Sequence, residues 1–163
     1  MLEQFRLIVV DDEKPQLEAL CSLLQDAGFD VEGFSEPVSA LECLKSQSFD
    51  VLLTDLRLPG MDGIELVQRA RQLDPDLSVV LMTGHGSIKT AVDAMKQGVL
   101  DYILKPFKVS ELMPVVNRAI EVRKLKLQNT QLIRDLSSSN SRLREMNHEL
   151  DHFAGRVAHD LNS

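Results

Sequence analysis

Short apolar runs alternate with stretches of helical spacing along the first 105 residues, and this alternation constrains the fold more than any other feature. Five runs are rich in Val, Leu and Ile, at residues 7–10, 31–34, 51–54, 79–82 and 100–104. Between them apolar residues recur three and four positions apart, and glycine or proline marks the segment ends. Strands that alternate with helices predict a parallel sheet covered on both faces, so we expect a doubly wound α/β fold.

The composition limits what the core and the surface can do. The chain of 163 residues is 44% hydrophobic, has no tryptophan and only 4% aromatic residues, so the core must be aliphatic. The first 110 residues carry 18 acidic and ten basic side chains. This excess of negative charge repels nucleic acid and attracts metal cations. For most of these acids we favour the simpler explanation, a solvated acidic surface.

Beyond Val109 the alternation stops, and one helix is expected from Ser110 nearly to the end of the chain. From Leu125 the core positions of a heptad fall at 125, 132, 139, 146 and 153 and at 129, 136, 143, 150 and 157. This pattern favours a parallel two-stranded coiled coil, and Asn129 at a core position supports two strands. The alternative is an amphipathic helix folded back on its own domain. We therefore expect a domain of residues 1–122 and a coiled-coil helix of residues 123–163.

Polar side chains follow four of the five predicted strands. Asp11 and Asp12 follow the first strand, Asp55 the third, Thr83 the fourth and Lys105 the fifth. The carboxyl ends of parallel strands lie at one edge of the sheet, where ligands bind in such folds. These five residues are therefore expected to converge. A single aspartate after a strand is more often a helix cap or a turn residue, but the joint arrangement favours a shared site.

The residue types predicted at that site suit the transfer of a phosphoryl group. Clustered carboxylates need a cation, and a ligand set made only of oxygen suits Mg²⁺. An aspartate such as Asp55 can act as a nucleophile and form an acyl phosphate. The charge on the transferred group then needs Mg²⁺, a lysine and a hydroxyl, which Lys105 and Thr83 supply.

Four segments carry a resemblance to a known family: residues 7–13 (LIVVDDE), 53–63 (LTDLRLPGMDG), 82–86 (MTGHG) and 101–107 (DYILKPF). They resemble the receiver domain of response regulators in two-component signalling, and the resemblance covers about three quarters of the chain. Residues 82–86 and 91–98 are most similar to receivers of the nitrogen-regulator type, which commonly precede an ATPase and a DNA-binding domain. The resemblance implies a flavodoxin-like sheet with the strand order 2-1-3-4-5.

The resemblance also implies a role for each acidic residue. Asp55 matches the aspartate that takes a phosphoryl group from the phosphohistidine of a kinase or a phosphotransfer protein. Asp11 and Asp12 match the residues that hold Mg²⁺ together with that aspartate. The backbone carbonyl at the position of Arg57 completes the metal ligands in the family.

Three more positions match the two switch residues and the lysine of the family. Thr83 matches the switch hydroxyl, and Tyr102 matches the switch aromatic, although it is also plausible as a plain core residue. Lys105 matches the family's lysine, and its bond to Pro106 is expected to be cis. His85 is interpreted as a loop residue at the rim of the site.

The last residues carry a second, shorter resemblance. Residues 149–163 (ELDHFAGRVAHDLNS) resemble the start of the phosphoacceptor and dimerisation domain of sensor histidine kinases over about a dozen positions. By position, His159 matches the phosphoaccepting histidine and Asp160 its acidic neighbour. With Val157 at heptad position a, His159 falls at c and is expected to be exposed, as is His152 seven residues earlier. The alternative is a surface histidine without a role.

Three functions are compatible with these features. The first is a phosphorylation-controlled receiver that drives a dimeric helix in a hybrid histidine kinase, although this chain has no glycine-rich ATP site. The second is the receiver and linker of a DNA-binding transcriptional regulator, and the third is a stand-alone adaptor without catalytic output. Arg123, Lys124 and Lys126 give the second slight support, but we interpret them as solvated bases on the coiled-coil surface.

Partners and location are predicted from the same features. We expect a cognate histidine kinase or phosphotransfer protein and a second copy of the chain as partners, with no nucleic acid bound by this chain. No apolar run approaches the roughly 20 residues that cross a bilayer, and no signal-peptide pattern opens the sequence. The expectation is a cytoplasmic protein without a membrane partner.

Overall fold

The computed structural model describes residues 3–84, 86 and 88–163, and His85 lies outside them. Each predicted apolar run matches a strand to within one residue at either end, and helices lie between the strands. In chain order the elements are β1 (Arg6–Val10), α1 (Lys14–Asp26), β2 (Asp30–Phe34), α2 (Pro37–Ser46), β3 (Val51–Asp55), α3 (Gly63–Leu73), β4 (Ser78–Thr83), α4 (Ile88–Lys96), β5 (Asp101–Leu104) and α5 (Val109–Leu161).

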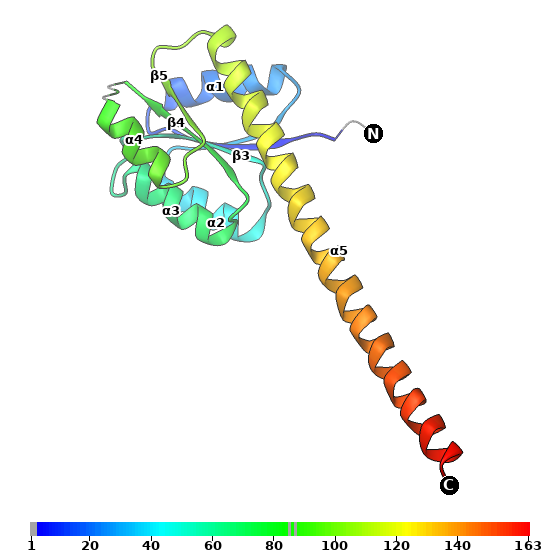
Figure 1. Cartoon of the computed structure of the whole chain (residues 1–163). Coiled ribbons are helices and arrows are strands. Elements are labelled where there is room, and N and C mark those ends of the chain that lie inside the picture. Colours follow the sequence, from blue (N-terminus) through cyan, green and yellow to red (C-terminus); the bar gives the residue numbers. More distant parts are fainter. Residues whose placement is uncertain (1–2, 85, 87) are drawn as a thin grey trace. The chain divides into compact units, whose positions relative to one another are not determined.

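The five strands form one parallel sheet in the order β2-β1-β3-β4-β5, as predicted (Figure 1). Asp55 at the end of β3 is paired in register with Met82 of β4, and Thr83 is paired with Leu104 of β5. Because all the strands run in the same direction, the residues that follow them emerge at the same edge of the sheet. This order places β1 and β3, which carry the acidic residues, side by side.

Two aliphatic layers enclose the sheet, since β1, β3 and β4 are buried on both faces apart from Arg6. Helices α1 and the first part of α5 cover one face, and α2, α3 and α4 cover the other. The largest fully buried side chains are mostly aliphatic, as the composition predicted: Phe49, Leu7, Ile8, Leu24, Leu52, Leu53, Leu66, Leu77, Met82, Leu112, Val9 and Val10. Burial of each such side chain stabilises the fold by about 1.5–3 kcal/mol, which holds the strand ends in place.

Helix α5 extends over 53 residues, in agreement with the long helix that the sequence predicted. The chain divides into two compact units, Met1–Lys124 and Leu125–Ser163. In the second unit the apolar heptad residues are exposed in the single chain: Leu125, Leu132, Leu136, Leu143, Met146, Leu150, Phe153 and Val157. Among the described helices, none has the length and hydropathy to span a bilayer.

Arg123 differs from its prediction. It was interpreted as a solvated base, but the residue is only 5% exposed and belongs to the first unit. Its guanidinium donates to the carboxylate of Asp74 at 2.8 Å and 3.0 Å, and lies 3.6 Å from Asp50. These acids precede β4 and β3, so Arg123 fastens α5 at the edge of the sheet opposite the strand carboxyl ends.

Candidate functional site

The predicted polar residues are brought together at the carboxyl edge of the sheet. Asp11 directly follows β1, Asp55 is the last residue of β3, and Lys105 directly follows β5. Asp11 is 1% exposed and Asp55 is 9% exposed, so both carboxylates are largely shielded from water. Buried charges need partners, because desolvation of an unpaired ion is costly.

Lys105 is the partner of both carboxylates. Its Nζ donates to Asp11 Oδ2 at 2.7 Å and to Asp55 Oδ2 at 2.9 Å, and a third bond at 3.2 Å reaches Gln16 Oε1. An ammonium has three N–H donors, so all of them are used. Burial alone would lower the pKa of Lys105, but the hydrogen bonds and charges of Asp11 and Asp55 outweigh burial and raise it. Lys105 is therefore held in its charged form between the two carboxylates.

The acidic side chains form a cluster that suits a divalent cation. Ligating oxygens of Asp11, Asp12 and Asp55 all lie within 4.8 Å of one another. Asp12 is exposed, whereas the other two are shielded, so a bound ion would keep access to solvent. An open set of hard oxygen ligands fits Mg²⁺, which retains several waters and shares its remaining positions with phosphate oxygens.

The main chain of the residues that follow Asp55 packs tightly around it. The amide of Arg57 donates to Asp55 Oδ1 at 3.2 Å, which keeps the main chain of Arg57 at the site. The amide of Gly63 donates to the carbonyl of Leu56 at 2.8 Å. A Cβ at position 63 would overlap the carbonyl oxygen of Asp55 and lie 2.9 Å from Leu56 Cα, so only glycine fits there. Asp62 then begins α3 by accepting a hydrogen bond from the amide of Glu65.

The two predicted switch residues lie on neighbouring strands of the sheet. Thr83 ends β4 and is 7% exposed. Tyr102 lies on β5 and is 38% exposed, and it borders a hollow of about 540 Å³ with Ile88, Val92 and Met95 of α4. The bond between Lys105 and Pro106 is cis, as the family resemblance implied.

A cavity of about 750 Å³ opens beside the carboxylates. One wall is acidic and carries Lys105, and the other is apolar and comes from α1 and the segment after β5. The lining residues are Asp11, Asp12, Glu13, Gln16, Ala19, Leu20, Leu23, Asp55, Arg57, Met82, Gly84, Lys105, Pro106 and Phe107. Gln16 was not predicted, because it lies within a helical pattern and its orientation toward Lys105 depends on how α1 packs. The cavity therefore opens directly beside the side chains of Asp55 and Lys105.

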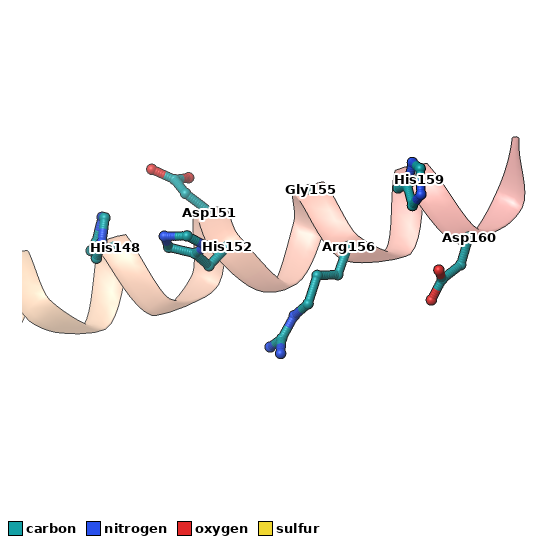
Figure 2. A pocket seen from close by; sticks show the side chains of 7 residues that line it. All are labelled: His148, Asp151, His152, Gly155, Arg156, His159 and Asp160. Carbon is teal, nitrogen blue, oxygen red and sulfur yellow. The ribbon is translucent and has the colours of Figure 1, made fainter.

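The second predicted site lies on the exposed helix of residues 125–161. His159 is exposed, as its heptad position predicted, and it borders a shallow hollow of about 520 Å³ (Figure 2). His148, Asp151, His152, Gly155, Arg156 and Asp160 also line this hollow. Among these side chains a ring contact between His148 and His152 is present, with centroids 4.7 Å apart.

Comparison with known proteins identifies relatives of this chain. The family model described as the response regulator receiver domain matches residues 7–117. The C4-dicarboxylate transport transcriptional regulatory protein DctD of Rhizobium meliloti is 36% identical over 137 residues, which is 84% of this chain and 30% of that protein. The transcriptional regulatory protein FixJ of Bradyrhizobium diazoefficiens is 37% identical over 74% of this chain and 58% of its own length. The DNA-binding transcriptional regulator NtrC of Escherichia coli is 42% identical over 69% of this chain and 24% of its own length. The chain thus spans less than two thirds of the length of these relatives.

Solved structures give the same result. A response regulator receiver domain protein from Clostridium thermocellum superposes with a TM-score of 0.70 and is 31% identical, covering 74% of this chain and 98% of its own. NtrX from Brucella abortus, solved in complex with ADP, superposes with a TM-score of 0.74 and is 34% identical, covering 79% of this chain and 30% of its own. The range matched by the family model, residues 7–117, contains Asp11, Asp12, Asp55 and Lys105.

Proposed function

The chain belongs to the response regulator receiver domain family, and from this membership we propose that Asp55 accepts a phosphoryl group from a phosphohistidine. The observation that carries the proposal is the contact of Asp55 with Lys105 at 2.9 Å, within a cluster that also holds Asp11 and Asp12. The donor is a cognate histidine kinase or a phosphotransfer protein, which docks with its phosphohistidine at the cavity beside Asp55.

In the proposed reaction a carboxylate oxygen of Asp55 attacks phosphorus and forms an acyl phosphate bond. The bond between phosphorus and the donor's imidazole nitrogen breaks, and its electron pair stays on that nitrogen, which is then protonated by solvent. Lys105 keeps its ammonium beside the phosphoryl oxygens and offsets their charge. Mg²⁺, held by Asp11, Asp12, Asp55 and the carbonyl of Arg57, would neutralise the remaining charge of the transferred group when bound.

We propose further that phosphorylation is transmitted through Thr83 and Tyr102. The hydroxyl of Thr83 would move toward the phosphoryl group, and the ring of Tyr102, half-exposed beside α4, would turn inward. The family resemblance and the partial exposure of Tyr102 support this role. The change would reach the output through α5, which begins four residues after Lys105 at the site's edge and is held to the receiver by the ion pair of Arg123 with Asp74.

The output element proposed for this chain is a helical dimer. The exposed stripe of heptad residues in the second unit has the pattern of a parallel two-stranded coiled coil, and Asn129 at a core position supports that register. Burial of the stripe against a second copy would remove apolar surface from water. In this proposal residues 1–122 are the receiver and residues 123–163 are the signalling helix, whose first residue, Arg123, still packs on the receiver and whose dimeric part begins at Leu125.

Two contexts for the output are proposed, in order of support. The relatives described above carry names of transcriptional regulators, and this favours a receiver that controls a DNA-binding regulator, with nucleic acid contacted by other parts of a longer protein. The second context is a hybrid histidine kinase, which rests on the likeness of residues 149–163 to a phosphoacceptor box and would make His159 a second phosphorylation site. Phosphoryl transfer onto His159 from a kinase ATP domain would distinguish the two contexts.

The phosphorylation proposal is tested with phosphoramidate as the donor, because its P–N bond mimics that of phosphohistidine. With Mg²⁺, the wild-type chain should gain one phosphoryl group by intact mass, and EDTA should prevent this. Asp55→Asn should remain unlabelled, whereas Asp62→Asn, an aspartate outside the cluster, should be labelled normally. Equal labelling of Asp55→Asn and wild type would remove the basis of the proposal.

The dimer proposal needs a separate measurement. Light scattering of the whole chain should give the mass of a dimer, and Leu143→Glu should shift the chain to the monomer mass because a charge would enter the apolar seam. Asp135→Asn, a change beside the seam, serves as the matched control. A monomer mass for wild type at high protein concentration would contradict the proposal.

A further inference from the structure

Histidines of α5 lie on the face opposite to the apolar stripe. With Leu150 and Val157 at heptad position a, His148 falls at f, and His152 and His159 fall at c. His148 and His152 are four residues apart, one turn of helix, and their ring centroids lie 4.7 Å apart with the planes nearly perpendicular. Figure 2 shows the ring of His152 extending along the helix toward His148. A dimer formed through the stripe leaves both rings in solvent.

We propose that His148 and His152 form a binding site for a divalent transition-metal ion of the Zn²⁺ and Ni²⁺ class. Neutral imidazole nitrogens are preferred ligands of these ions. Two histidines one turn apart on a helix are the spacing with which helices chelate zinc, and the segment His148-Glu-Leu-Asp-His152 has this spacing. Asp151 lines the same hollow and adds negative charge next to the rings.

The ion would be held by two protein ligands and water. Among the described residues, three ligating side chains gather closely only at Asp11, Asp12 and Asp55, so His148 and His152 have no third protein ligand. The hollow is also shallow and open, unlike the enclosed site of a zinc hydrolase. The site therefore fits a structural ion and not a catalytic one.

The two metal sites of the chain differ in ligand type. The acidic cluster offers only oxygens, which Mg²⁺ prefers, whereas the histidine pair offers nitrogens, which Mg²⁺ binds poorly. Because of this difference in ligand type, saturating Mg²⁺ should leave the histidine pair available.

Arg156 is the one arginine or lysine among the described residues that line the hollow, and in Figure 2 its side chain extends to the side of the helix away from Asp151.

Metal binding would strengthen the helix that leads to His159. The two imidazoles meet one ion only while residues 148–152 are helical, so the ion binds the folded helix and not the unfolded segment. A ligand of this kind stabilises the state that it binds. The inference requires neither phosphorylation of His159 nor the proposed function of Asp55.

The test is a calorimetric titration of the whole, tag-free chain with Ni²⁺ and then Zn²⁺ in saturating Mg²⁺. Wild type should bind one ion at this site. His148→Ala and His152→Ala should each weaken Ni²⁺ affinity at least about tenfold, since loss of a direct ligand costs no less than loss of an outer-shell partner. His159→Ala is the matched control, because His159 lies on the same helix face as His148 and His152 but outside their ring contact. This variant should bind Ni²⁺ with wild-type affinity.

Amide exchange gives a second readout. Ni²⁺ should slow exchange across residues 148–156 in wild type and in His159→Ala, and not in His152→Ala. Alanine is a good helix former, so the variants should keep their helix content by circular dichroism. Equal affinity in wild type and both ligand variants would overturn the proposal. The proposal would also be overturned if both histidine variants still bound the ion and the double variant Cys21→Ser, Cys43→Ser did not.

Discussion

Replacement of Lys105 by methionine is expected to destabilise the receiver most strongly when divalent metal is absent. The ammonium lies 2.7 Å from Asp11 and 2.9 Å from Asp55, whose side chains are 1% and 13% exposed. Methionine keeps an apolar stem of similar length and removes the charge. Three carboxylates would then remain within 4.8 Å of one another without a counter-ion.

The size of the loss follows from this burial. Removal of one partner from a buried ion pair costs about 3–5 kcal/mol. The Lys105 side chain is 17% exposed and Asp12 is open to water, so we expect the lower end, about 3 kcal/mol. In a domain of this size that loss lowers the melting temperature by roughly 10 °C. Saturating Mg²⁺ supplies a replacement charge and should recover most of the stability.

Urea unfolding in EDTA and in Mg²⁺ measures both effects. Lys45→Met is the matched control, because Lys45 also lies 2.7 Å from its partner Glu42 but the side chains are 55% and 64% exposed. A surface pair of this kind contributes less than about 1 kcal/mol. The reasoning is refuted if Lys105→Met is as stable as Lys45→Met in EDTA, or if Mg²⁺ stabilises Lys105→Met no more than wild type.

The pH dependence of stability checks the same contact. The pKa of Lys105 is raised above its ordinary value of 10.5, since the hydrogen bonds and charges of Asp11 and Asp55 outweigh burial. The folded chain therefore holds this proton more tightly than the unfolded chain does. The stabilisation is complete below the unfolded pKa and is lost as the pH rises through the raised folded value. Above about pH 10.5, wild type should lose stability more steeply than Lys105→Met.

Three further variants test other parts of the first unit. Asp12→Asn should raise the free energy of unfolding in EDTA by about 1 kcal/mol, which is the Coulomb energy in water of two like charges about 4 Å apart. The same change should weaken Mg²⁺ binding. A lower stability of this variant in urea would contradict the reasoning. Gly63→Ala should cost about 1–3 kcal/mol and reduce phosphorylation, because its Cβ would overlap the carbonyl of Asp55; wild-type behaviour in both assays would argue against it. Arg123→Ala should cost about 2 kcal/mol in urea, because Asp74 would lose its counter-charge. Phosphorylation should be unchanged, since the contact lies at the sheet edge opposite the acidic cluster, and a loss of phosphorylation would contradict this.

The fold and the centre of the site were predictable because both depend on short-range patterns. Strands buried on both faces must be continuous apolar runs, so their ends can be located in the sequence to within one residue. Once the sheet is parallel, Asp11, Asp55 and Lys105 have to share an edge, and the structure places Lys105 between the two carboxylates.

Features that depend on packing were not predictable. The contact of Gln16 with Lys105 depends on the rotation of α1 about its axis, which no spacing rule fixes. The burial of Arg123 was missed because its neighbours are typical of a solvated helix, and only the approach of Asp50 and Asp74 gives it a partner. The role of His159 depends on a partner domain, which the pattern of one helix does not identify.

The bonds of Lys105 join parts of the chain that are made at different times. Its ammonium meets Asp11 across 94 residues and Asp55 across 50 residues of sequence. During synthesis on the ribosome, both aspartates leave the exit tunnel well before the lysine that neutralises them. A nascent chain that has exposed only β1 to β4 therefore carries Asp11 and Asp55 without the ammonium that neutralises them. Under the proposed function, the site would be complete only once β5 has joined the sheet and brought Lys105 to the two carboxylates.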